Sequence, residues 1–223
     1  MSENWLGRWN EGRIGWHEAD GNEGLRQCWP SLPEGSRVLV PLCGKAVDLL
    51  WLAGRGMRVS GVELSELAVK TFFADHGIEY ARDDSGALPA YHAVDRPITL
   101  YCGDFFEFAD QRHDAMYDRG ALVALPCERR PDYVAHCSDL LRADAFRLVI
   151  TLEYDQSVVD GPPFAVMPDE IGRYWPDLRR VREYHDTESF PPKFRAAGLE
   201  SITEAVWAPE VRCRAERRCQ ASW

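Results

Sequence analysis

The stretch from Arg37 to Glu66, RVLVPLCGKAVDLLWLAGRGMRVSGVELSE, predicts the fold of this 223-residue chain. It opens with an apolar run that is typical of a strand buried on both faces of a parallel sheet. A tight turn that contains Gly44 follows, and then a helical apolar pattern over 46–55. A second strand over 58–63 ends in an acidic residue. The stretch therefore predicts a strand–turn–helix–strand unit with a carboxylate at the tip of its second strand.

That carboxylate, Glu63, points to a nucleoside ligand. At this place in a strand–turn–helix–strand unit, an acid can accept hydrogen bonds from both hydroxyls of a ribose. The turn has only Gly44, whereas the dinucleotide fingerprint has three spaced glycines, so the usual cradle for a pyrophosphate is missing. We therefore expect an adenosine ligand without phosphates, of which S-adenosylmethionine is the common one. The alternative is a unit whose turn binds nothing, with Glu63 merely solvated.

Composition narrows the class of protein. The chain is 45% hydrophobic and 28% charged, which suits one sizeable core. It has no apolar run of the roughly 18 residues that a membrane helix needs and no secretory pattern at its start, so we expect a cytoplasmic protein. Seven cysteines at irregular spacings argue for reduced thiols rather than a disulfide framework, and no convincing zinc site is visible. The formal net charge of −10 disfavours nucleic acid. We expect a monomer that acts on a small molecule, with no membrane partner.

The rest of the chain alternates between strand and helix patterns, as an open sheet with helices on both faces requires. We predict an α/β, Rossmann-like fold with a mostly parallel, seven-stranded sheet. The further strands are expected at 98–102, 115–118, 146–152, 178–185 and 201–207, the further helices at 21–29, 64–76, 121–125, 131–141, 168–174 and 192–197, and a surface loop at 82–97.

One domain accounts for most of the chain. We expect a lid segment rich in aromatic residues at 1–20, a single domain at 21–208, and a polar tail at 209–223 that is flexible. In the first segment, Trp5 and Trp9 are four residues apart and would share one side of a helix. They either anchor an amphipathic helix on the core or, with Trp16, cover a sulfonium cofactor and an aromatic substrate.

Asp104 and Phe105, which follow the strand at 98–102, could contact a ligand or could belong to a capped turn. Asp104 and Phe105 follow that strand directly and could meet the amino group and the ring face of an adenine. Asp104 could instead cap the turn that begins at Phe105. The position after the third strand favours the ligand.

Three strings occur in order along the chain: PLCGKAVDLLWLAGRGMRVSGVELSE, YDRGALVAL and DGPPF. Preceded by WLGRWNEGRIGWHE, they resemble the thiopurine S-methyltransferase family from about Trp5 to Trp207. The combination of PLCGKA with DRGALVA is more particular than either string alone. The resemblance implies one class I methyltransferase domain, S-adenosylmethionine as methyl donor, and methylation of an aromatic or heterocyclic thiol such as a thiopurine. Some bacterial members are also associated with methylation of selenium and tellurium species, which would be metalloid detoxification.

The resemblance also implies site residues. Glu63 would hold the ribose hydroxyls, Asp104 and Phe105 would flank the adenine, and Arg119 would approach the methionine carboxylate. The implied cofactor contacts are Trp5, Trp9, Leu42, Glu63, Asp104, Phe105 and Arg119, and the implied substrate contacts are Trp16, Pro163 and Lys193. Some members carry Phe where this chain has Trp16 and Arg where it has Lys193. Because lysine offers a compact charge rather than a planar fork, this difference bears on substrate preference.

Methyl transfer from a sulfonium to a thiolate needs neither a metal nor a covalent nucleophile, so orientation is the main task of the protein. Lys193 or Arg119 could stabilise the thiolate. We assign no dedicated catalytic base, and Asp20 and His17 are reserve candidates.

Three other functions fit parts of the sequence. A nicotinamide-dependent oxidoreductase shares the fold but needs the missing glycines. A non-catalytic nucleoside-binding protein would keep the same sheet without turnover. A metal-assisted catechol methyltransferase would use carboxylates at the ends of the fourth and fifth strands, where Asp118 and Glu153 lie.

Overall fold

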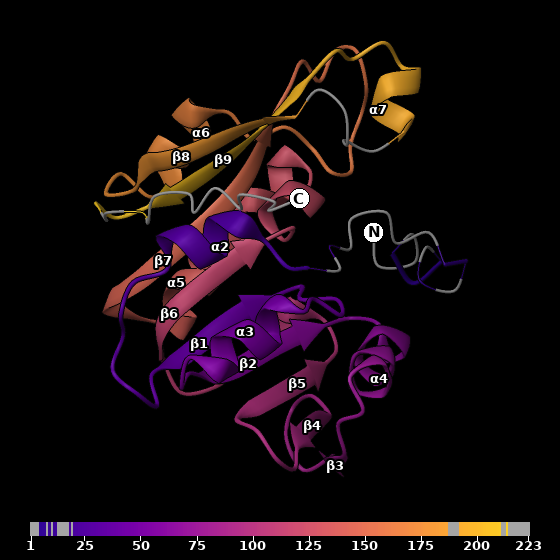
Figure 1. Cartoon of the computed structure of the whole chain (residues 1–223), viewed down its shortest axis with the longest axis vertical. Coiled ribbons are helices and arrows are strands. Elements are labelled where there is room, and N and C mark those ends of the chain that lie inside the picture. The colour runs from indigo at the N-terminus through magenta and orange to yellow at the C-terminus, as the bar shows by residue number, and fades with distance from the viewer. Residues whose placement is uncertain are drawn as a thin grey trace, which may run out of the picture.

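The computed structural model describes residues 5–7, 9, 11–12, 18, 20–186, 192–210 and 213. Within these residues, nine strands form a single sheet (Figure 1). The strands are β1 Arg37–Pro41, β2 Arg58–Glu63, β3 Tyr80–Asp83, β4 Ala90–Ala93, β5 Ile98–Cys102, β6 His113–Arg119, β7 Leu141–Glu153, β8 Arg179–Asp186 and β9 Ile202–Ala208. Their order across the sheet is β3-β4-β5-β2-β1-β6-β7-β9-β8.

The centre of the sheet is parallel and both edges are antiparallel. Strands β5, β2, β1, β6 and β7 pair in parallel, whereas β3–β4, β4–β5, β7–β9 and β8–β9 pair antiparallel. The chain moves outward from β1 through β2 to β5 on one side and from β6 to β7 on the other. The order therefore reverses between β1 and β6, and ligands of open α/β sheets bind in the crevice at such a point.

Helices cover both faces of this sheet, as the sequence predicted. One buried cluster packs α2, α3 and α4 against the sheet, and a second cluster packs α5 and α6 against the other face. Along β1, Val38 and Val40 belong to the first cluster and Leu39 to the second, because side chains alternate across a strand. The helices are α2 Glu23–Cys28, α3 Asp48–Gly54, α4 Glu66–Asp75, α5 Arg130–Leu140, α6 Pro168–Tyr174 and α7 Pro192–Ala196, with short 3-10 turns η1 Phe105–Glu107, η2 Leu122–Ala124 and η3 Cys127–Arg129.

Two helices begin at side chains that cap them. The Asn22 side chain accepts a hydrogen bond from the Leu25 N–H at the start of α2, and the Ser65 hydroxyl accepts one from the Ala68 N–H at the start of α4. Such caps stabilise a helix by about 1 kcal/mol each because they satisfy backbone donors of the first turn. Ser65 lies two residues past Glu63, so this cap also fixes where the chain leaves β2.

The prediction of seven strands was wrong, because the segment expected to be a loop contains strand. Residues 80–83 and 90–93 form β3 and β4, an antiparallel pair at one edge of the sheet. All four residues of β3 are exposed, so this edge strand has no apolar alternation to reveal it. Its pairing comes from β4, which in turn pairs with β5. The five parallel central strands and the strands at 179–186 and 202–208 were predicted.

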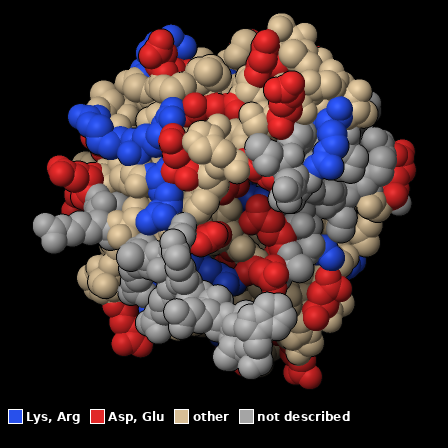
Figure 2. Space-filling view, turned by 45° about the horizontal axis from the view of Figure 1, so that its top comes forward, with Lys and Arg blue, Asp and Glu red and all other residues tan. Residues whose placement is uncertain are grey.

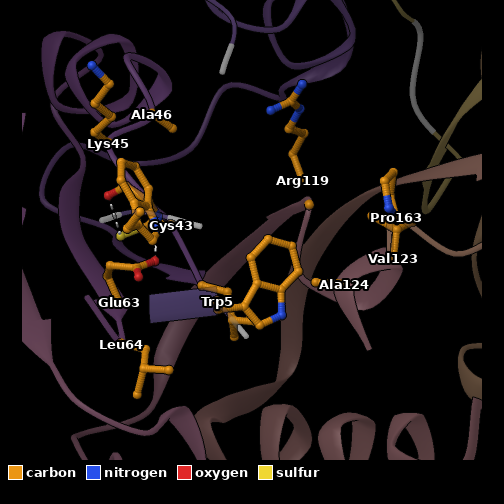
Figure 3. A pocket seen from close by; sticks show the side chains of 14 residues that line it. Trp5, Cys43, Lys45, Ala46, Glu63, Leu64, Arg119, Val123, Ala124 and Pro163 are labelled. Atoms are coloured by element: carbon orange, nitrogen blue, oxygen red, sulfur yellow. Dashed lines mark hydrogen bonds between the residues drawn. The ribbon is translucent and has the colours of Figure 1, made fainter. Parts of the chain in front are cut away.

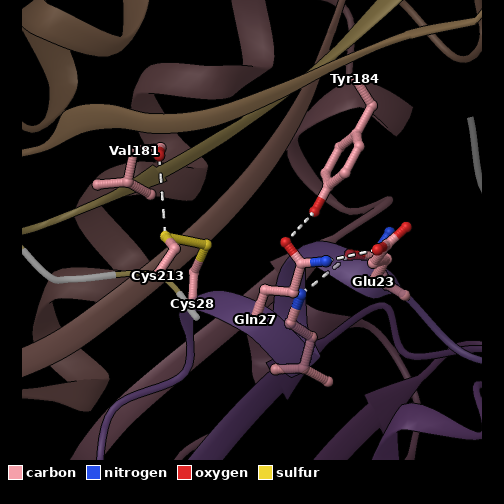
Figure 4. Close-up of a disulfide and its surroundings, with 8 residues drawn as sticks. Glu23, Gln27, Cys28, Val181, Tyr184 and Cys213 are labelled. Carbon is pink, nitrogen blue, oxygen red and sulfur yellow. Dashed lines mark hydrogen bonds between the residues drawn. A yellow bond between two sulfur atoms is a disulfide. The ribbon is translucent and has the colours of Figure 1, made fainter. Parts of the chain in front are cut away.

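The prediction that all cysteines are reduced was also wrong. A disulfide joins Cys28, at the end of α2, to Cys213, across 185 residues of sequence (Figure 4). The Cys213 sulfur also lies 3.8 Å from the Val181 carbonyl oxygen of β8. Sequence spacing does not reveal a pair whose closeness is created by folding. Flexibility of the polar tail as a whole stays a prediction, since only a few of its residues are described.

The surface mixes charges of both signs. Figure 2 shows acidic side chains gathered around a hollow on one face, with basic side chains among them. Across the described part of the chain, no helix is long and apolar enough to cross a lipid bilayer.

Candidate active site

The turn after β1 is bent so that its backbone can meet a ligand. Leu42 has φ 47°, in the left-handed region that a side chain of this kind rarely adopts, and Gly44 has φ 54°. A Cβ on Gly44 would lie 3.4 Å from the Trp9 indole, so a glycine lets the indole pack closely there. The Gly44 N–H donates a hydrogen bond of 2.9 Å to the Glu63 carboxylate. Strained backbone of this kind is common at binding sites.

Glu63 lies at the end of β2 and is held by two backbone donors. Gly44 N–H binds Oε2, and Ser65 N–H binds Oε1 at 2.8 Å. The side chain is 7% exposed, and its burial raises its pKa although the two N–H groups act in the opposite direction. A carboxylate oxygen can accept two hydrogen bonds, so both oxygens keep capacity for a ligand hydroxyl.

Glu63 faces a hollow between the first turn and the end of β6 (Figure 3). The hollow and the open solvent at its mouth together make up about 870 Å³. Figure 3 shows Glu63 and Cys43 on one side, Arg119 and Pro163 across from them, and Trp5 between. The order of the sheet reverses here, so the hollow lies where the topology predicts a ligand.

The wall of the hollow that lies opposite Glu63 begins after Asp118, the last buried residue of β6. Its Oδ1 accepts hydrogen bonds from the N–H groups of Ala121 and Leu122 at 3.2 Å, and its Oδ2 accepts one from the Tyr133 hydroxyl at 2.8 Å. Complete burial raises the pKa of Asp118 to about 6. This carboxylate therefore braces the turn that carries Arg119, whose guanidinium pairs with Glu18.

The loop that follows β7, residues 154–167, closes one side of the hollow through Pro163. The Tyr154 hydroxyl donates to the Pro163 carbonyl at 2.7 Å, and Phe164 N–H donates to the Val123 carbonyl at 2.6 Å. The Lys193 ammonium group donates to the Pro162 carbonyl from α7. The loop is thus held by one internal hydrogen bond and attached to η2 and α7, which places an apolar wall opposite Glu63.

The structure brings six of the predicted site residues together. They all line the hollow, although they come from four separate segments of the chain. Their roles toward a ligand stay predictions. The six are Trp5, Trp9, Leu42, Glu63, Arg119 and Pro163.

Other predicted residues lie elsewhere. Asp104 is exposed and caps η1 by accepting from the Phe106 N–H at 3.0 Å, the alternative that the sequence left open. Phe105 is buried against Tyr133, and neither residue lines the hollow. Their place beside the adenine stays a prediction. Lys193 does not line the hollow either, since its ammonium group meets carbonyl oxygens of the adjacent loop.

Three further residues complete the comparison with the sequence. Asp20 lines a separate, acidic hollow beside α2 rather than the one that contains Glu63. Trp16 and His17 fall outside the described residues, so their predicted roles stay predictions.

Several lining residues were missed. Lys45, Ala46, Leu64, Val123 and Ala124 also face the hollow. Each is a sequence neighbour of a residue that was predicted, so the strings PLCGKA, VELSE and DRGALVA contained the signal. Glu18, the partner of Arg119, had no such signal because it lies 101 residues away.

The two carboxylates considered for a metal are engaged by protein groups. Asp118 accepts the three hydrogen bonds described above, and Glu153 pairs with Arg180 at 2.6 Å. Among the described residues, no three or more His, Cys, Asp or Glu side chains are grouped as a metal site would require.

Two solved structures that share this fold are methyltransferases. The 1,6-didemethyltoxoflavin-N1-methyltransferase of Burkholderia thailandensis, with bound S-adenosylhomocysteine, matches with a TM-score of 0.59 over 94% of this chain and 87% of that chain, at 16% identity. An S-adenosylmethionine-dependent methyltransferase of Thiobacillus denitrificans, in complex with S-adenosylhomocysteine, matches with a TM-score of 0.58. The match covers 92% of this chain and 97% of that chain, at 14% identity. The fold is therefore that of the class I S-adenosylmethionine-dependent methyltransferases.

Sequence relatives define the family more narrowly. The thiopurine S-methyltransferase of Pseudomonas putida is 44% identical over 209 residues, 91% of this chain and 96% of that protein. The thiopurine S-methyltransferase of Bordetella petrii is 43% identical over 213 residues, which cover 92% of this chain and 96% of that protein. The family described as thiopurine S-methyltransferase matches residues 1–212. This chain belongs to that family and is a S-adenosylmethionine-dependent methyltransferase.

The site fits this cofactor. Glu63 presents a carboxylate with spare acceptor capacity, and the two-hydroxyl edge of a ribose is a matching donor. The first turn has no run of glycine N–H groups for a pyrophosphate, and S-adenosylmethionine has none. The indoles of Trp5 and Trp9 add flat aromatic surface, which attracts a sulfonium cation.

Proposed function

We propose that this enzyme transfers the methyl group of S-adenosylmethionine to the sulfur of an aromatic or heterocyclic thiol, with thiopurines as the representative class. The observation that carries the proposal is the apolar wall of Val123, Ala124 and Pro163, which lies beside Arg119 and across the hollow from Glu63. A flat, apolar ring fits such a wall, and an anionic sulfur fits a guanidinium. The family name of the relatives supports the same class of acceptor.

The chemistry places modest demands on the protein. S-adenosylmethionine supplies a methyl group that its sulfonium charge already activates. The residues of the chain then have to align the acceptor and exclude water, and alignment of this kind can contribute on the order of 7–11 kcal/mol. In our proposal Glu63 fixes the sugar and the indoles cover the hollow. Arg119 approaches the methionine carboxylate of the cofactor and also favours the thiolate form of the acceptor. Aromatic thiols ionise readily, so no strong base is needed.

A methyl-transfer assay with the purified full chain tests this proposal. A thiopurine, a thiophenol, a catechol and selenite are compared as acceptors, each with and without a chelator. We expect turnover of both thiols that the chelator leaves unchanged. Turnover of catechol alone with loss on chelation would favour the metal-assisted reaction, and turnover of selenite alone would favour methylation of metalloid species. Either result would overturn the thiol proposal while leaving the methyltransferase family intact.

A further inference from the structure

Behind Arg119 lies a set of buried polar side chains from several distant segments. Asp48, at the start of α3, is 3% exposed and does not line the hollow. Its Oδ1 accepts a hydrogen bond from Asn22 N–H at 2.8 Å, and its Oδ2 accepts one from the Tyr117 hydroxyl at 2.9 Å. This carboxylate therefore ties together α3, the start of α2 and strand β6.

Two routes of contact lead from Asp48 to Arg119. Tyr117 and Arg119 are two residues apart in β6, so their side chains leave the strand on the same face. On the other route, the Asn22 amide donates to Glu204 at 3.0 Å and to Glu18 at 3.4 Å, and Glu18 pairs with the Arg119 guanidinium. We call Glu18, Asn22, Asp48, Tyr117, Arg119 and Glu204 the Arg119 network.

The backbone is shaped to let this network form. Gly21 has φ 73°, and a Cβ there would lie 2.5 Å from Oδ1 of Asp48. A side chain at position 21 would therefore displace the carboxylate from the Asn22 N–H. The glycine permits the close approach, and the chain turns directly into α2 from it.

The charges of the network support a structural link to Arg119. Burial lowers the pKa of the Arg119 guanidinium, but Glu18 and then Tyr117, Glu204 and Asp48 act against it and leave the pKa above its ordinary value. Burial raises the pKa of Asp48, and its two hydrogen-bond donors and Arg119 oppose that effect. Each recorded partner of Asp48 is a donor, which suits a carboxylate that only accepts.

We propose that Asp48 is a positioning residue for Arg119. By holding Tyr117 beneath the guanidinium and Asn22 beside Glu18, it sets where the cation meets the ligand in the hollow. This inference rests on the cofactor site and does not depend on the identity of the thiol.

Binding of S-adenosylhomocysteine to the full chain, measured by calorimetry, tests the role of Asp48. Asp48→Ala is expected to raise the dissociation constant about 10-fold, because both hydrogen bonds of the carboxylate are lost. Asp48→Asn is expected to stay within about 3-fold, since its amide oxygen can accept from Asn22 and its NH₂ can donate to Tyr117. This partial rescue separates a positioning role from a general loss of packing. Binding to the unsubstituted chain independently reports whether the cofactor site exists.

A double-mutant cycle with Arg119→Ala shows whether Asp48 acts through the guanidinium. In the Arg119→Ala background, Asp48→Ala should change the affinity less than about 2-fold, because the group that it positions is gone. Tyr174→Phe is the matched control, since it removes a tyrosine–carboxylate hydrogen bond of 2.9 Å to Glu170 in α6. Its effect should be the same in both backgrounds.

Two results would overturn the proposal. One is a folded Asp48→Ala protein that binds with unchanged affinity, and the other is a loss of affinity that persists in full without Arg119. If Asp48→Ala does not fold in thermal melting, Tyr117→Phe replaces it. That variant removes one of the two hydrogen bonds and should raise the dissociation constant about 3-fold only when Arg119 is present.

Discussion

The two sides of the hollow are built in different ways. On one side, the Glu63 corner (Leu42, Gly44, Glu63 and Ser65) comes from a single stretch of chain, and backbone N–H groups hold its carboxylate. On the other side, the Arg119 network draws on residues from 18 to 204, and apart from the Asn22 N–H it is held by contacts between side chains. A local corner can be recognised from a short sequence, whereas the dispersed network exists only after the sheet has formed.

The difference also affects how each side responds to substitution. At the Glu63 corner, the donors are backbone groups whose positions are determined by the turn after β1 and by the junction of β2 with α4. Loss of the Glu63 side chain removes contacts to the ligand and leaves the Gly44 and Ser65 N–H groups without this partner, but it displaces no other side chain of the corner. In the Arg119 network, one side chain positions the next, so a change spreads through neighbours that share hydrogen bonds.

Of the changes predicted here, loss of the Glu63 side chain is expected to have the largest effect, which is a loss of cofactor affinity. Glu63→Ala should raise the dissociation constant for S-adenosylhomocysteine at least about 100-fold, because two charge-assisted hydrogen bonds of ~1.5–3 kcal/mol each are lost. Calorimetry measures the change. Glu66→Ala is the control, because Glu66 is an acid three residues away that pairs with Lys70 and Arg82 at the surface. A folded Glu63→Ala protein with native affinity would remove this residue from the site.

Opening the disulfide tests how firmly α2 supports the Arg119 network. Cys213→Ser releases the end of α2, and disulfides of this kind typically contribute about 2–4 kcal/mol to the free energy of unfolding. The melting temperature should fall by roughly 5–10 °C in a chain of this length. Cys127→Ser, at an exposed free cysteine, should melt like the native protein. Reductant should lower the melting temperature of the native protein and of Cys127→Ser but not that of Cys213→Ser. Equal melting of the native protein and Cys213→Ser without reductant would contradict the role of the bridge.

Asp118, the buried acid that precedes Arg119 in β6, makes the stability of this side of the hollow depend on pH. The pKa of Asp118 is about 6 in the fold and near 3.8 as a free group, so between these values the unfolded chain releases a proton that the folded chain keeps. This contribution to stability is present below pH ~4 and is lost as the pH rises through 6, by about 3 kcal/mol in all. Asp118→Asn should therefore gain stability relative to the native chain between pH 4 and 7.

Urea unfolding at several pH values measures this gain. The amide of Asp118→Asn can still accept from Ala121 N–H and donate to the Tyr133 oxygen, so the shape of the site is retained. Asp139→Asn, at an exposed acid of α5, should show no comparable gain. A constant difference between Asp118→Asn and the native chain across this range would show that the buried acid does not retain its proton.

The smallest effect is expected at the loop 154–167, which we call the acceptor loop because our proposal places the thiol beside Pro163. Lys193→Met removes an ammonium group that donates to the Asp160 and Pro162 carbonyls, and exposed bonds of this kind are worth about 0.5–1 kcal/mol. The KM for a thiol should rise about 3-fold while affinity for S-adenosylhomocysteine stays unchanged. Lys193→Arg keeps donors in place and should lie closer to the native enzyme. Steady-state kinetics measures the KM for the thiol, and calorimetry measures the affinity for S-adenosylhomocysteine. A change in cofactor affinity alone would contradict the assignment of Lys193 to the acceptor loop.

Prediction from sequence succeeded where short-range patterns decide the structure. The apolar runs of β1 and β2 predicted the central fold, and the acid at the end of β2 predicted that Glu63 faces the hollow. The exposed edge strand at 80–83 escaped because none of its residues is buried. Cys28 and Cys213 escaped because nothing near either cysteine indicates its partner.

The sequence by itself determined the parallel centre of the sheet, the turn at Gly44 and the carboxylate at the end of β2, because strand burial and turn chemistry depend on neighbouring residues. Tertiary structure alone decided that Glu18 meets Arg119, that Asp48 meets Tyr117, and that Lys193 contacts the acceptor loop. Those contacts join segments that are distant in sequence, and only the packing of both faces of the sheet brings them within hydrogen-bond distance.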